Sequence, residues 1–185
     1  MAQPDISPAD YLAAERASPA EKHEYFDGIV RRRGPQPRDH ATILFNIIFF
    51  LDAALHGTEH AVFSSDMRVQ LSSTCFVYPD VAVSTDRSMP STDDVLRSPV
   101  LAIEIFTPAT VAFDVGQKAL RYRACPTLKE YVLVDYERPF VHVQRRTSSG
   151  NQWEMRDYRD GEGVELRCLG LTVPMAAIYR TIAKD

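Results

Sequence analysis

Two acidic residues stand inside otherwise apolar segments of the chain. Asp80 lies in VYPDVAV and Glu104 lies in VLAIEIF, and Ala82 and Ala102 stand two residues away from them. If both segments are β-strands, side chains two residues apart share a face, so each acid lies beside an alanine that leaves room for a ligand. A buried acid without a partner is unfavourable. We therefore interpret Asp80 and Glu104 as candidate functional residues.

The chemistry of such a pair depends on whether the two segments are neighbours in a sheet. Two buried acids at close range repel each other and do not both ionise readily. A divalent cation removes this conflict, and Mg²⁺ binds through one or two carboxylates while keeping waters for a phosphate ligand. The alternative for either acid alone is an edge-strand residue or a structural ion pair.

A lysine follows on a predicted helix. The segment TVAFDVGQKALRYR places Asp114, Lys118 and Tyr122 at positions i, i+4 and i+8, on one helical face. Lys118 could reach a metal-bound water or a scissile phosphate if this helix packs beside the strand of Glu104. It could equally be a solvated residue paired with Asp114.

The elements that must position these residues follow from turn and capping signals. Ser7 and Pro8 are typical of a helix start, Asp27-Gly28 of a hairpin turn, and Gly57 of a helix end. We predict helices over residues 8–17, 38–55, 110–124 and 174–182, and strands on either side of Asp27-Gly28 within 24–32 and over 61–64, 66–71, 75–83, 99–106, 130–135, 139–146 and 152–159. This order indicates a mixed α+β fold with a helix-flanked sheet in a single domain, 1–185.

Composition sets limits on the protein class. The 185 residues are 45% hydrophobic and 25% charged, and the net charge of −4 provides no basic field for non-specific DNA binding. The N-terminus lacks a signal-peptide pattern, and the longest apolar stretch, residues 43–55, is too short to cross a membrane. The three cysteines form no CxxC pair. We expect a soluble cytoplasmic protein.

Five ordered segments carry a resemblance to a known family: FSSDMRV (63–69), YPDVAV (78–83), LAIEIFTPAT (101–110), DVGQKALRYR (114–123) and LKEYVLVD (128–135). Together they resemble the PD-(D/E)XK nuclease superfamily. More narrowly, the chain is similar to a bacterial putative restriction endonuclease family in which the motif lysine has moved from strand to helix. The similarity extends from HEYFDG (23–28) to LGLTVPMAAIY (169–179).

This resemblance implies a restriction-endonuclease-like core with a central mixed sheet flanked by helices, and Mg²⁺-dependent cleavage of DNA. Asp80 and Glu104 match the metal-binding acids, Glu24 matches a further acid that completes the site, and Lys118 matches the displaced lysine. Mn²⁺ is expected to substitute for Mg²⁺, and a homodimer is expected because two sites must address two strands. Three residues match supporting positions: His40, Asn46 and Tyr122.

Arginines near these segments are candidates for phosphate contacts, although each could also lie on a solvated face. They are Arg31, Arg32, Arg33, Arg121, Arg123, Arg145 and Arg146.

Two other functions compete with a nuclease. A non-catalytic module of the same fold could bind nucleic acid or a partner protein. The intact set of Asp80, Glu104 and Lys118 argues against it, whereas Phe106 leaves it open because that position of the ExK motif usually holds the lysine. No protein partner is identifiable from the sequence. The segment HGTEH, residues 56–60, matches the zinc-hydrolase pattern HxxEH. That pattern needs an uninterrupted helix, and Gly57 is expected to end the helix there.

Overall fold

The segment that carries Asp80 connects two β-sheets of the protein. The computed structural model describes residues 5–18, 20–86, 88–150 and 152–182. Its helices are α1 (Pro8–Ala17), α2 (Arg38–Leu55), α3 (Val111–Phe113), α4 (Ala119–Ala124) and α5 (Met175–Ile178), with a π-helical turn over Asp114–Lys118 and a 3₁₀ turn over Arg167–Leu169. The strands are β1 (His23–Phe26), β2 (Ile29–Arg32), β3 (Ala61–Ser64), β4 (Arg68–Ser72), β5 (Cys75–Val77), β6 (Val81–Ser84), β7 (Val95–Leu96), β8 (Pro99–Phe106), β9 (Glu130–Asp135), β10 (Phe140–Arg146), β11 (Trp153–Arg159), β12 (Gly163–Leu166) and β13 (Leu171–Pro174).

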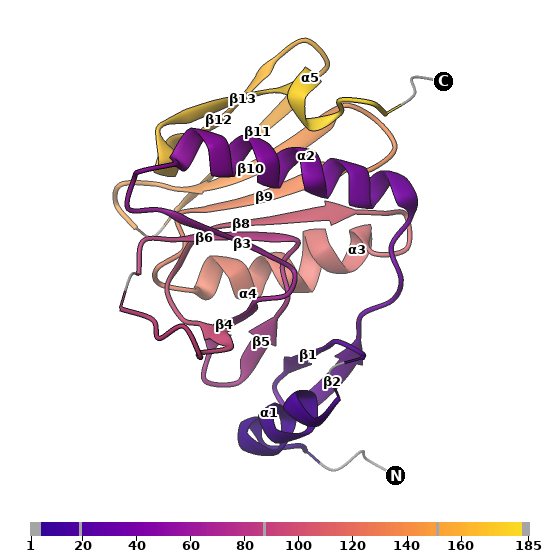
Figure 1. The fold of residues 1–185 in the computed structure, drawn as a ribbon, viewed down its shortest axis with the longest axis vertical. Helices are drawn as coiled ribbons and strands as arrows, with labels where there is room; N and C mark the ends of the chain where they lie inside the picture. The colour runs from indigo at the N-terminus through magenta and orange to yellow at the C-terminus, as the bar shows by residue number, and fades with distance from the viewer. Residues whose placement is uncertain (1–4, 19, 87, 151, 183–185) are drawn as a thin grey trace.

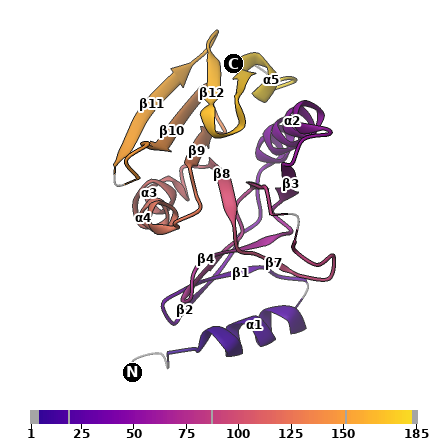
Figure 2. The same ribbon diagram turned by 90° about the vertical axis from the view of Figure 1, so that its left-hand side faces the viewer.

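The larger sheet has six strands in the order β11-β10-β9-β8-β6-β3, and the smaller one has five in the order β2-β1-β5-β4-β7. Strands β8 and β9 are parallel, whereas β6 pairs with β8 antiparallel, so the larger sheet is mixed. Helix α2 covers one side of this sheet, and α3 and α4 lie on the other (Figures 1 and 2). This arrangement confirms the predicted helix-flanked mixed sheet.

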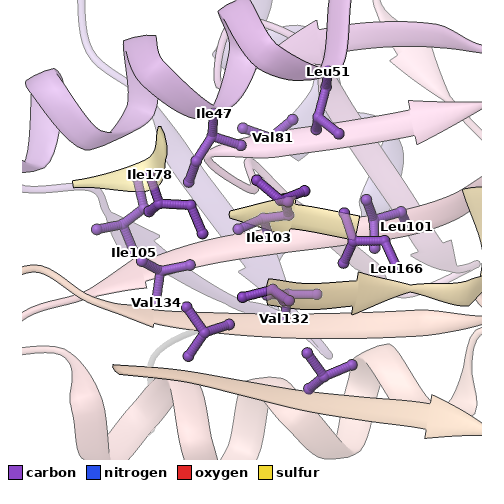
Figure 3. Packing of buried hydrophobic residues seen from close by; sticks show 14 of the residues in the cluster. Ile47, Leu51, Val81, Leu101, Ile103, Ile105, Val132, Val134, Leu166 and Ile178 are labelled. Carbon is purple, nitrogen blue, oxygen red and sulfur yellow. The ribbon is translucent and has the colours of Figure 1, made fainter. Parts of the chain in front are cut away.

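Helix α2 is bound to the sheet through one apolar stripe. Ile43, Ile47, Leu51 and Leu55 recur every four residues and are all buried, as expected for one face of an α-helix. Figure 3 shows Ile47 and Leu51 above aliphatic side chains of β6, β8 and β9. Among the described residues, no helix is long and apolar enough to cross a membrane.

Strand β8 divides its side chains between two different environments. Leu101, Ile103 and Ile105 belong to the cluster under α2, whereas Ala102 belongs to the cluster on the opposite side, beneath α4. Glu104 is on the same face as Ala102 because strand side chains alternate. The apolar half of β8 thus anchors the strand while the other half faces the candidate site.

The prediction of one continuous strand over residues 75–83 is wrong. It is divided into β5 and β6, which belong to different sheets, and Tyr78, Pro79 and Asp80 connect them. Pro79 has no N–H to donate, and the N–H of Tyr78 donates to the carboxylate of Glu24 instead of to a neighbouring strand. The backbone therefore leaves one sheet at Val77 and enters the other at Val81.

Two of the four predicted helices agree with the structure, and two differ from it in length or in helix type. Helix α2 begins and ends as predicted, and Ser7 caps α1 by accepting a hydrogen bond from the Asp10 N–H at 3.2 Å. The helix predicted over 110–124 contains the π-helical turn. The one predicted over 174–182 is too long, because α5 ends at residue 178, and a short hairpin of β12 and β13 precedes it.

Candidate active site

Asp80 and Glu104 come together because β6 and β8 are neighbours. Val81 pairs with Ile103 and Ala82 with Ala102, and this antiparallel register continued by one residue places Asp80 opposite Glu104. The backbone N–H of Ile105 donates to Oδ2 of Asp80 at 2.7 Å. The strands that carry or adjoin the two acids are therefore neighbours in one sheet, as the pairing of Asp80 with Glu104 requires.

Glu24 and Lys118 reach the same place from two other elements. Glu24 lies on β1, where its Oε1 accepts the Tyr78 N–H at 3.0 Å. The Nζ atom of Lys118 lies 2.8 Å from Oε1 of Glu24 and 2.8 Å from Oε1 of Glu104. One buried ammonium group thus bridges two carboxylates that are eighty residues apart in the chain.

Lys118 is the last residue of a π-helical turn. Residues 114–118 form this turn between α3 and α4, and the hydroxyl of Tyr131 donates to the carbonyl of Asp114 at 3.1 Å. π-Helical turns inside α-helices frequently occur at functional sites. Asp114 and Lys118 are both buried, and so is Tyr122 one turn further on. The predicted shared face is therefore turned inwards.

Asp80 is held by two cationic or polar partners from the N-terminal part of the chain. Nη2 of Arg33 lies 2.6 Å from Oδ1, and Nε2 of His40 lies 3.2 Å from Oδ2. Burial raises the pKa of Asp80, but the hydrogen bond to His40 and the charge of Arg33 outweigh it and lower the pKa to about 2. Asp80 is therefore a carboxylate at neutral pH.

Glu104 has the opposite tendency. Burial raises its pKa to about 8, the positive charge of Lys118 opposes the rise, and the charges of Asp80, Asp114 and Glu24 add to it. The hydroxyl of Tyr122 donates to Oε1 of Glu104 at 2.7 Å. Glu104 therefore ionises less readily than a free glutamic acid.

Burial lowers the pKa of Lys118, but the charges of Glu104 and Glu24 outweigh burial and raise it above its ordinary value. Lys118 is therefore protonated at neutral pH and acts as a cation toward both glutamates.

The side chains surround a cavity of about 110 Å³. Its acidic lining residues are Glu24, Asp80, Glu104 and Asp114, and its cationic ones are Arg31, Arg32, Arg33 and Lys118. Hard carboxylate oxygens are the donors that Mg²⁺ prefers, so the chemistry of the lining fits this metal. Asp114 is an acid that sequence reasoning did not assign to the site, although its position four residues before Lys118 was a usable signal.

Arg33 is the second residue with a role that was not foreseen. It was predicted as one of several phosphate-binding arginines, whereas here it is the ion-pair partner of Asp80. The sequence carried no signal for this pairing. Arg33 directly follows β2 and Asp80 lies between β5 and β6, so the two residues meet only in the folded protein.

The remaining predicted residues lie in different places. His40 contacts Asp80 and Tyr122 contacts Glu104, as described above. Asn46 does not line the cavity: its Nδ2 donates to the carbonyls of Ile178 at 3.0 Å and Arg180 at 2.8 Å, which ties the C-terminal segment to α2.

Several of the other arginines also have structural contacts. Arg121 pairs with Asp27 and Arg145 with Glu130. Arg146 donates to the carbonyls of four residues, Leu128, Gly150, Arg123 and Cys125.

The HGTEH segment does not form one helix. Helix α2 ends at Leu55, His56 is its C-terminal cap, and Gly57 has a φ of +77°, which ends the helical path. The two histidines therefore do not share a helical face, as the zinc-hydrolase pattern requires.

The fold is that of restriction-endonuclease-like proteins. It matches the crystal structure of a putative nuclease belonging to DUF820 from Anabaena variabilis with a TM-score of 0.75 and 17% identity, over 94% of this chain and 97% of that one. Residues 8–176 match the Uma2 family model, which describes putative restriction endonucleases, and the chain belongs to this family.

Two relatives from Synechocystis sp. extend this comparison. The uncharacterized protein slr1290 is 30% identical over 181 residues, covering 97% of this chain and 94% of the relative. The uncharacterized protein sll1609 is 29% identical over 133 residues, covering 70% of this chain and 75% of the relative.

Proposed function

We propose that this chain is a metal-dependent endonuclease that hydrolyses phosphodiester bonds in DNA. The observation that carries the proposal is the convergence of Asp80, Glu104 and Glu24 around one cavity, with the buried ammonium group of Lys118 against two of them. Membership of a family described as putative restriction endonucleases supports the same reaction class. Buried acids are unfavourable for stability, so their concentration at one place favours a functional role.

Asp80, Glu104 and Glu24 are the residues proposed to hold Mg²⁺, with Mn²⁺ able to replace it. When bound, such a cation lowers the pKa of a coordinated water and offsets the negative charge that grows on the phosphate. Four carboxylates line the cavity, while Lys118 and Arg33 are the cations in contact with them. A divalent cation beside Glu104 would favour its carboxylate form, which burial and the neighbouring acids oppose.

The other side chains position these acids. The Tyr122 hydroxyl donates to Glu104, and Arg33 and His40 hold Asp80, so both carboxylates have defined orientations. Lys118, which the sequence suggests as the displaced motif lysine, is proposed to orient the attacking water or to stabilise negative charge on the phosphate.

Cleavage of plasmid and single-stranded DNA by the purified protein tests this proposal. We expect cleavage with Mg²⁺ or Mn²⁺, none with EDTA, and none in Asp80→Ala, Glu104→Ala or Lys118→Ala. A variant of the same size change outside the cavity, Asp52→Ala, is the control and should cleave like the wild type. Full metal-dependent cleavage by the three site variants would show that these residues do not have the proposed roles.

The second candidate is a non-catalytic module that binds nucleic acid or a partner protein. One observation favours it: Lys118 bridges Glu24 and Glu104, and among the described residues no three Asp, Glu, His or Cys side chains are arranged to hold one metal ion. Titration calorimetry separates the two candidates. Binding of Mn²⁺ that is lost in Glu104→Ala supports the nuclease, whereas DNA binding without any metal binding supports the module.

Assembly and location complete the proposal. We infer a homodimer, because cleavage of duplex DNA requires a site for each strand, and light scattering that gives a monomer mass at working concentration would contradict this. A reducing cytoplasm is supported by free thiols at Cys75, Cys125 and Cys168.

A further inference from the structure

Four cationic side chains line the cavity, and three of them are held by carboxylates. Lys118 and Arg33 contact the acids of the site, and Nη2 of Arg32 lies 2.7 Å from Oε1 of Glu21. Arg31 differs from them, because it forms no ion pair with any residue that the structure describes. Its charge is therefore available to a ligand.

The β1–β2 hairpin turns Arg31 toward the site. Arg31 is the register partner of Glu24, and partners in an antiparallel pair have their side chains on the same face. Arg33, two residues further along, reaches Asp80 on that face, whereas Arg32 between them pairs with Glu21. Side-chain alternation therefore directs Arg31 and Arg33 toward the acids of the site, whereas Arg32 pairs with Glu21.

An aromatic platform holds the Arg31 side chain in place. The guanidinium carbon lies 3.7 Å from the ring centroid of Phe113, which also lines the cavity. Phe26 forms a T-shaped pair with the same ring, with centroids 5.3 Å apart and an interplanar angle of 89°. A guanidinium group stacked on a ring keeps its in-plane N–H groups free, and these match a phosphate bidentately.

We propose that Arg31, held against Phe113, binds a backbone phosphate of the nucleic acid strand beside the phosphate at Asp80 and Glu104. This inference rests on the proposed function, since its ligand is the substrate of that site. It adds a binding subsite that is separate from the proposed metal ligands, and it separates Arg31 from Arg33, which the structure commits to Asp80.

Fluorescence anisotropy with a labelled duplex oligonucleotide tests the subsite without relying on catalysis. Binding is measured in EDTA over a series of KCl concentrations for the wild type, Arg31→Ala, Arg31→Lys and Phe113→Leu. Arg16→Ala is the control, because it removes an arginine that lies outside the cavity lining and already has a carboxylate partner, Asp94. Circular dichroism melting checks that each variant is folded. If Arg31→Ala does not fold, Arg31→Lys and Phe113→Leu test the subsite in its place.

We expect Arg31→Ala to bind about tenfold more weakly, as for the loss of one charged hydrogen-bonding group. The slope of log K against log[KCl] should fall by about 0.9, the value for one phosphate contact. Arg31→Lys and Phe113→Leu should bind with intermediate affinity, because the first loses the bidentate geometry and the second loses the platform. Arg16→Ala should retain the wild-type affinity and slope.

Cleavage by the wild type, measured in parallel, separates this inference from the proposed function. If the wild type cleaves DNA and Arg31→Ala keeps the wild-type affinity and slope, the subsite is wrong and the nuclease stands. If the wild type binds DNA through Arg31 but cleaves none, the subsite stands and hydrolysis is wrong. A wild type that neither binds nor cleaves DNA overturns both.

Discussion

The two faces of the six-stranded sheet come from the same strands and differ in almost every other respect. Toward α2, the sheet presents branched aliphatic side chains such as Leu101, Ile103 and Val132. Toward α4, it presents the small residues Ala82 and Ala102 beside Glu104 and tyrosines. The first face is filled with apolar contacts, whereas the second buries charge beside a cavity.

The alternation of side chains along single strands therefore places the residues for stability on one face and those for chemistry on the other. Burial of apolar area on the α2 face contributes roughly 25 cal/mol per Å² to folding. On the opposite face, buried acids are tolerated because Lys118, Arg33, His40 and Tyr122 contact them. Substitutions on the two faces should therefore have separable effects.

The largest expected effect is the loss of cleavage in Glu104→Gln. This change keeps the shape of the side chain but removes the carboxyl group proposed to bind the metal. We expect a decrease in kcat/KM of about a thousandfold, since metal ions supply several kcal/mol of transition-state stabilisation. The free energy of unfolding should change by much less, and chemical denaturation measures it. A collapse in stability that parallels the loss of cleavage would contradict the division between the faces.

The converse substitution is Leu51→Ala on the α2 face. Leu51 is fully buried, and its truncation should lower the free energy of unfolding by about 3 kcal/mol, because the cavity left behind closes only in part. Urea denaturation measures this loss. The folded fraction should cleave DNA at the wild-type rate at a temperature well below its melting point. A reduced rate there would mean that α2 packing also controls the site.

A smaller effect is expected for Tyr122→Phe, which deletes the hydroxyl that donates to Glu104. Residues that orient metal ligands typically contribute 10- to 100-fold, so metal affinity should fall by about tenfold, which calorimetry with Mn²⁺ measures. The control is Tyr25→Phe, whose hydroxyl donates to the carbonyl of Ile6 far from the cavity. Equal metal affinities for both variants would argue against a positioning role for Tyr122.

The smallest effect concerns Asn46, a residue that the sequence grouped with the site. Its contacts to the carbonyls of Ile178 and Arg180 assign it to the apolar side. Asn46→Ala should therefore lower the free energy of unfolding by about 1 kcal/mol, the typical contribution of a hydrogen bond. DNA cleavage should be unchanged, and a loss of cleavage without a loss of stability would return Asn46 to the site.

The sequence predicted the parts of this fold that depend on local signals. Gly57 predicted the end of α2, and Asp27-Gly28 predicted the hairpin, where both residues adopt positive φ values. The alternation in β8 predicted that Glu104 shares a face with Ala102, and Ala102 does lie on the side away from α2. Each of these features is decided by neighbours within a few residues.

Features that depend on distant partners were not predictable in this way. The break at Tyr78 depends on Glu24, fifty-four residues earlier, which accepts the N–H that a continuous strand would have paired. The β12–β13 hairpin has four residues in each strand, too few to show a clear period. Arg33 and Asp80 meet only because the two sheets join at that point.

A crystal structure of the protein soaked with Mn²⁺ tests whether Asp80 and Glu104 hold a metal ion. Anomalous scattering locates the ion independently of the protein density. We expect a Mn²⁺ peak in the cavity with carboxylate oxygens of Asp80 and Glu104 as ligands, and with Lys118 beside it. A cavity without Mn²⁺ at saturating concentration, with Lys118 still bridging Glu24 and Glu104, would contradict it.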